Sequence, residues 1–107
     1  MNLSELREAG AFVEPEPVKV PVTWTRQTAD GEKTSKFDIW VRRRAFGLID
    51  KIMASDGDRS RSSQMIAHCV LLGDECEPMT YDEAFSLNPS LAWAMVNAIN
   101  EASAPKN

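Results

Sequence analysis

Two stretches in the first half of the chain alternate apolar and polar residues. The apolar positions are the even-numbered ones from Val18 to Trp24 and the odd-numbered ones from Phe37 to Val41. A period of two residues is typical of a strand that buries one face. The sequence therefore predicts two half-buried strands, at about residues 18–25 and 36–42.

The dipeptide Asp30-Gly31 lies between these stretches and predicts the two-residue turn of a β-hairpin. This turn places three apolar pairs on one face: Trp24 with Phe37, Val22 with Ile39, and Val20 with Val41. A shift of one residue would destroy every pair, so the turn and the apolar pattern select the same register. We expect the tip, residues 26–35, to project into water.

Apolar residues recur every three or four positions in the rest of the chain, which is the spacing of amphipathic helices. The predicted helices span about residues 44–54, 62–72, 81–87 and 89–102. A hairpin alone is marginal in water, so its apolar face must pack on these helices. The predicted fold class is α+β, an N-terminal β-hairpin packed against three to four helices, in a single domain of residues 1–107.

Both ends of the chain are predicted to lie outside the core. Residues 1–17 form an arm and connector, in which Asn2 and Glu5 cap a short helix that stops at Gly10. Two prolines in the segment FVEPEP then exclude a helix or a central strand. Residues 103–107 are expected to fray.

Composition and charge are those of an ordinary globular protein, with 43% hydrophobic and 26% charged residues. The net charge of −4 repels phosphate, so nucleic acid would need a local basic patch. The chain does not begin with a signal-peptide pattern, and no apolar run approaches the roughly 18 residues of a membrane span. We expect a cytosolic protein with no membrane partner.

The residues that could carry chemistry form no known motif. His68, Cys69 and Cys76 are three candidate metal ligands, but structural zinc takes four, and adjacent residues point to different sides of a helix. The sequence contains no Gly-rich phosphate loop, HExxH motif or EF-hand. We therefore expect no catalytic, metal or cofactor site and no enzymatic activity. Cys69 is expected in the core as a free thiol, with His68 and Cys76 exposed.

Five residues are candidates for contact with a partner: Trp40, Arg42, Arg43, Arg44 and Trp93. Trp40 lies on the strand face opposite the apolar one, so either helices cover that face too or Trp40 meets a partner. Trp93 lies off the apolar stripe of the last helix, and we expect a wide core face to bury it. The arginine triplet is suited to phosphate, but it can equally pair with acids or with a protein partner.

Three stretches of the chain carry a family resemblance: AFVEPEPVKVPVTW, FDIWVRRR and SSQMIAHCVLLGDECEPMTYDEAFSLNPSLAWAMVNAINEAS. Their order resembles that of the tail assembly chaperones of long-tailed bacteriophages. In that family a small β element is followed by helices, with an acidic turn and a capped T-x-x-E helix before a closing helix. The resemblance covers nearly the whole chain, although the arginine triplet and the DGDRSRSS loop match no requirement of the family.

The resemblance implies a non-enzymatic protein without cofactors, made in the cytoplasm of the infected bacterium and absent from the mature virion. Its implied partners are the phage tape measure protein, a long helical protein that such chaperones keep soluble, and the major tail tube protein. Homo-oligomerisation is left open. An alternative function is a small nucleic-acid-binding regulator that uses Arg42–Arg44, and a metal or thiol protein is a third hypothesis.

Overall fold

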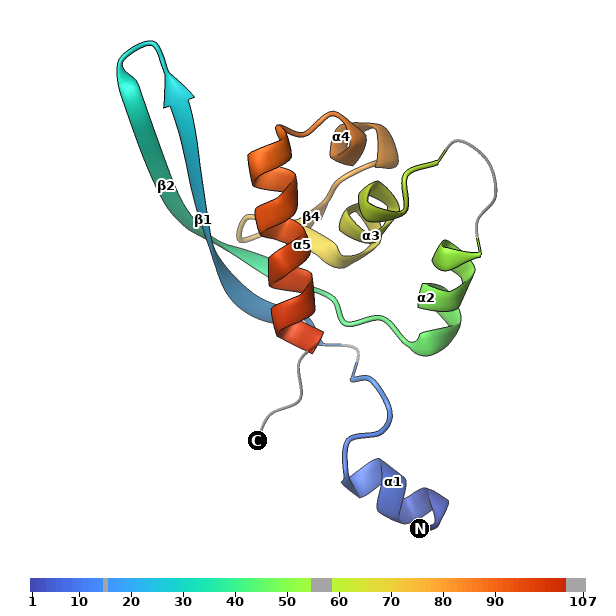
Figure 1. Ribbon diagram of the computed structural model, residues 1–107. Helices are drawn as coiled ribbons and strands as arrows, with labels where there is room; N and C mark the ends of the chain where they lie inside the picture. The colour runs from blue at the N-terminus through green and yellow to red at the C-terminus, as the bar shows by residue number, and fades with distance from the viewer. Residues whose placement is uncertain (15, 55–58, 104–107) are drawn as a thin grey trace.

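A long β-hairpin dominates the computed structural model, which describes residues 1–14, 16–54 and 59–103 (Figure 1). Its strands, β1 (Val18–Thr28) and β2 (Gly31–Val41), pair antiparallel along their whole length. Both are longer than predicted, because backbone pairing continues through the polar residues as far as the turn. The tip projects beyond the helices, as expected.

The register of the hairpin differs from the predicted one by two residues. The observed pairs are Val20 with Ile39, Val22 with Phe37, and Trp24 with Ser35. The prediction was wrong about the turn, whose central residues are Ala29 and Asp30. The prediction made Gly31 the second central residue of the turn, whereas here Gly31 follows the two central residues and has a positive φ of 109°. Because the shift is even, every side chain keeps its predicted face.

The hairpin is part of a four-stranded sheet with the order β1-β2-β3-β4. The added strands are β3 (Val70–Leu72) and β4 (Glu77–Pro78). The prediction of a helix over residues 62–72 is therefore wrong for its last three residues, which form β3. Val70 and Leu71 pair instead with Val41 and Trp40 of β2, because a short apolar run suits a buried strand as well as a helix.

Five helices complete the described part of the chain. They are α1 (Leu3–Glu8), α2 (Phe46–Met53), α3 (Arg61–Cys69), α4 (Tyr81–Phe85) and α5 (Pro89–Ser103). The capping boxes Asn2–Glu5 and Thr80–Glu83 both form. The α+β class is confirmed. The division into arm, domain and tail stays a prediction, and most of the predicted frayed tail, residues 104–107, lies outside the described residues.

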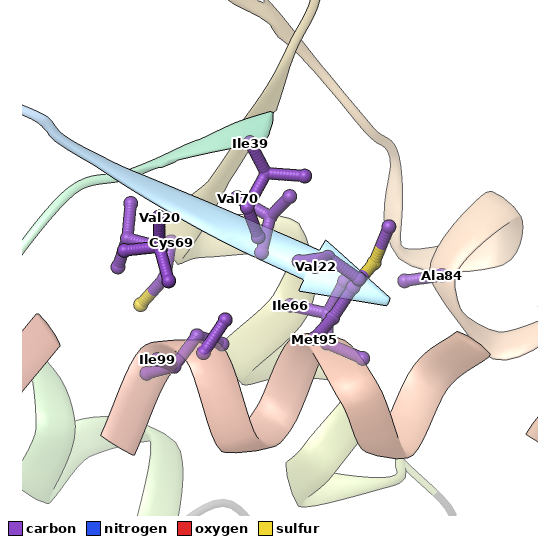
Figure 2. Packing of buried hydrophobic residues seen from close by; sticks show 11 residues of the cluster. Val20, Val22, Ile39, Ile66, Cys69, Val70, Ala84, Met95 and Ile99 are labelled. Carbon is purple, nitrogen blue, oxygen red and sulfur yellow. The ribbon is translucent and has the colours of Figure 1, made fainter. Parts of the chain in front are cut away.

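The core lies between the sheet and the helices α3 and α5 (Figure 2). Figure 2 shows Met95 and Ile99 of α5 beneath Val22 and Val20 of β1. Ile39 of β2 is fully buried in the same cluster. The predicted apolar face of the hairpin is thus the one that the helices cover.

A hydrogen bond ties the first turn of α5 to the hairpin. The indole Nε1 of Trp24 donates to Ser90 Oγ at 2.9 Å, and the Arg26 guanidinium lies 4.2 Å from the centroid of the same indole. Trp24 is therefore half-buried, although its partner across the hairpin is polar. These contacts fix the position of α5 along β1.

Candidate functional site

Trp40 lies on the outer face of the sheet, opposite the face that packs on α5. Its neighbours in β2, Ile39 and Val41, are both fully buried in the core. Across the strands it faces Lys19 and Leu71, and Lys19 Nζ lies 5.6 Å from the centroid of its ring. Trp40 is half-buried by these neighbours, and its contact with a partner stays a prediction.

Two of the three arginines attach β2 to the end of α3. The Arg42 backbone N–H donates to the Cys69 carbonyl oxygen at 2.7 Å, and Arg44 Nε donates to the His68 carbonyl oxygen at 3.1 Å. Burial, followed by the charge of Arg44, lowers the pKa of Arg42. Basic side chains commonly bind the last carbonyls of a helix, so Arg44 has a structural role here.

The third arginine, Arg43, pairs with the arm that precedes β1. Its guanidinium lies 3.9 Å from a carboxylate oxygen of Glu14, and its side chain is 31% exposed. All three arginines are half-buried, whereas a phosphate-binding patch needs cations that are open to solvent. The arrangement of Arg42–Arg44 therefore gives the nucleic-acid hypothesis no support.

His68 and the two cysteines do not come together as a reactive site. Cys69 is buried, as predicted, and burial raises the pKa of its thiol. His68 and Cys76 are half-buried rather than exposed. Burial, then the charges of Arg44, Arg42 and Arg59, lowers the pKa of His68. Within the described residues no group of three or more metal-binding side chains lies together.

A groove lies where α3, α4 and α5 meet, lined by apolar side chains and by Ser60, Ser62 and Ser63, with a volume of about 160 Å³. We call it the aromatic groove and define it by Ile66, Ala84, Phe85, Leu87, Trp93 and Val96. Phe85 and Trp93 stand at its border and are 62% and 60% exposed. Large apolar side chains gathered around a hollow mark a surface that a partner can cover.

Trp93 is one of the predicted partner-binding residues, and the expectation that the core would bury it was wrong. The buried side of α5 is centred on Met95, Ala98 and Ile99. A residue two positions before Met95 lies about 200° around the helix from it, so Trp93 points away from the sheet. The structure thus leaves Trp93 available at the surface, while contact with a partner stays a prediction.

Sequence reasoning missed Phe85, which lies within the helix predicted over residues 81–87. The ring centroids of Phe85 and Tyr81 lie 5.9 Å apart, and the Arg59 guanidinium lies 4.2 Å from the Tyr81 ring centroid. The hydroxyl oxygen of Tyr81 also accepts a hydrogen bond from the Ser60 backbone N–H at 2.8 Å. Phe85 is therefore held in place at the groove. A helix of five residues can bury only one face, here that of Ala84. The shortness of the helix was therefore the feature of the sequence that could have indicated an exposed Phe85.

The other exposed aromatic side chains lie apart from the groove. Phe46, at the start of α2, is 80% exposed, and Phe12, in the arm, is 52% exposed and lies under the guanidinium of Arg7. None of the helices in the described ranges is long and apolar enough to cross a membrane. The aromatic groove is therefore the clearest candidate surface for a protein partner.

Comparison with known protein families gives a match that extends over most of the chain. The family model described as "Phage tail assembly chaperone, TAC" matches residues 4–103. No curated protein matches, and no solved structure matches.

Proposed function

Because the chain belongs to the phage tail assembly chaperone family, we propose that it binds the tape measure protein of its phage through the aromatic groove. It keeps that protein soluble and assists assembly of the tail tube, in contact with the major tail tube protein. Its role is one of binding rather than catalysis. It acts in the cytoplasm of the bacterial host and is absent from the mature virion.

The observation that carries this proposal is the exposure of Phe85 and Trp93 around one groove. A long amphipathic helix exposes an apolar stripe that aggregates unless another protein covers it. A hydrophobic groove between helices can receive such a stripe, with aromatic residues as anchors. The hydrogen bond and stacking that hold Tyr81 and Phe85 reduce the ordering cost of this contact.

Co-expression tests the proposal. The tape measure protein from the same phage genome is expressed alone, with this chain, and with a variant that carries Phe85→Ser and Trp93→Ser. We expect the tape measure protein in the supernatant only with the native chain. The matched control is Phe46→Ser, which removes a still more exposed aromatic ring outside the groove and should leave solubility unchanged. If the native chain adds no solubility, the proposed function fails.

A further inference from the structure

Tyr81 lies beside the aromatic groove rather than in its lining, yet it contacts residues from two of the segments that form the groove. The lining combines Phe85 of α4 with three serines at the start of α3, Ser60, Ser62 and Ser63. The Tyr81 ring stacks on that of Phe85, with centroids 5.9 Å apart. The hydroxyl oxygen of Tyr81 accepts a hydrogen bond from the Ser60 backbone N–H at 2.8 Å. One side chain outside the groove therefore joins its serine side to its aromatic side.

The hydrogen bond between Ser60 and Tyr81 fixes the point at which α3 begins. Ser60 is the N-cap of α3, since its Oγ accepts from the Ser63 N–H at 3.2 Å and its carbonyl oxygen accepts from the Gln64 N–H at 3.0 Å. The N–H groups at the start of a helix have no partner within it. Tyr81 supplies that partner from α4, which packs directly against α3. The serine side of the groove is thus held against α4.

The ring of Tyr81 restricts the motion of Phe85. Phe85 is 62% exposed, and an exposed side chain ordinarily changes rotamer within picoseconds to nanoseconds. Tyr81 and Phe85 are four positions apart in α4, the spacing at which helical side chains meet, and their rings are inclined by 28°. The Arg59 guanidinium, 4.2 Å from the Tyr81 ring centroid, holds that ring in turn. The ring of Phe85 is therefore held at the groove before a partner arrives.

We propose that Tyr81 is a positioning residue of the aromatic groove, and that its ring and its hydroxyl act on different sides of the groove. The ring fixes the rotamer of Phe85, and the hydroxyl fixes the first turn of α3. This role rests on the proposed function, because it prepares the groove for the tape measure protein. A groove that is already formed binds more tightly, since less side-chain motion is lost on binding. Tyr81 therefore affects binding without lining the groove.

NMR of the native chain and of two variants tests this role without a partner. In the native chain, the χ1 coupling constants of Phe85 should report a single rotamer, whereas those of Phe46, which is 80% exposed, should be averaged. Tyr81→Leu should make Phe85 average as Phe46 does, and Tyr81→Phe, which keeps the ring, should leave Phe85 in one rotamer. Amide exchange at Ser60 should quicken about tenfold or more in Tyr81→Phe. An averaged Phe85 in the native chain, or unchanged exchange at Ser60 in Tyr81→Phe, overturns the proposal.

Calorimetric titration with a soluble tape measure fragment measures the effect on binding. Tyr81→Leu should raise the Kd about fivefold, which is the cost of ordering one freed side chain, and Tyr81→Phe should raise it less. The matched control is Asp82→Asn, at the next residue of α4, which is exposed and outside the groove lining, and its Kd should be the native one. Equal Kd values for the native and Tyr81→Leu chains overturn the role of Tyr81 and leave the proposed function intact. If the native chain does not bind the fragment, the proposed function fails, and the rotamer of Phe85 still decides whether Tyr81 positions it.

Discussion

Replacing Trp93 with alanine removes the larger of the two anchors at the aromatic groove without disturbing the core. Trp93 is 60% exposed. Taking about 250 Å² for a whole tryptophan, a partner can cover at most about 150 Å², worth about 4 kcal/mol at roughly 25 cal/mol per Å². Incomplete coverage and the cost of ordering reduce this to about 2 kcal/mol, or roughly a 30-fold increase in Kd.

Calorimetric titration of a soluble tape measure fragment into the native and Trp93→Ala chains measures this change. The matched control is Phe46→Ala, because Phe46 is also strongly exposed but lies at the start of α2. The free energy of unfolding of both variants should stay within about 0.5 kcal/mol of the native value, as is usual for surface changes. An unchanged Kd for Trp93→Ala, or a larger loss for Phe46→Ala, would refute the assignment of the groove.

Three further predictions concern the stability of the fold. Ile39→Ala creates a cavity in the core, where Ile39 is 0% exposed, and should lower the free energy of unfolding by about 3 kcal/mol in urea titrations; a loss under about 1 kcal/mol would contradict the packing described. Ser60→Ala removes the cap of α3, in which Ser60 Oγ accepts a hydrogen bond from the Ser63 N–H at 3.2 Å, and should lower the free energy of unfolding by about 1 kcal/mol. An unchanged free energy of unfolding would argue against Ser60 as the start of α3. Burial and nearby arginines lower the pKa of His68 below its ordinary 6.5, so the unfolded chain binds more protons there and stability falls as the pH drops below that value. His68→Gln should reduce this pH dependence in urea titrations, and an identical slope in both proteins would show that His68 does not cause it.

The apolar pattern predicted which faces of the hairpin are buried but not which residues oppose each other. Val20, Val22, Ile39 and Val41 lie in the core as their alternation requires. The register depended on the backbone conformation of the turn, and Gly31 takes its positive φ one position after the two central residues. Residue types constrain this choice only weakly, because several turn types accept Asp-Gly.

The strand β3 illustrates a second limit of the sequence. Val70 and Leu72 fit the apolar stripe predicted for this helix as well as they fit a strand. Pairing with β2 decides between the two structures, since the backbone groups of Trp40 face away from β1 and need partners. That requirement arises only in the folded chain.

Within the candidate site, the sequence identified Trp93 as a possible partner contact, but it did not predict that Trp93 is exposed. The sequence placed Phe85 only within a predicted helix, because its position beside Trp93 depends on how α4 and α5 meet. The role assigned to the arginine triplet also required the structure, because the bond from Arg44 to the His68 carbonyl joins residues far apart in the sequence.

Hydroxyl-radical footprinting of the purified complex with the tape measure protein tests the central claim most directly. In the free chain, Phe85, Trp93 and Phe46 are all exposed and should be oxidised readily. In the complex, we predict that oxidation of Phe85 and Trp93 falls about tenfold or more, as expected for buried anchors, while Phe46 reacts as before. If a complex forms and the two groove residues react as in the free chain, or if no complex forms, the account of how this chaperone binds its partner is contradicted.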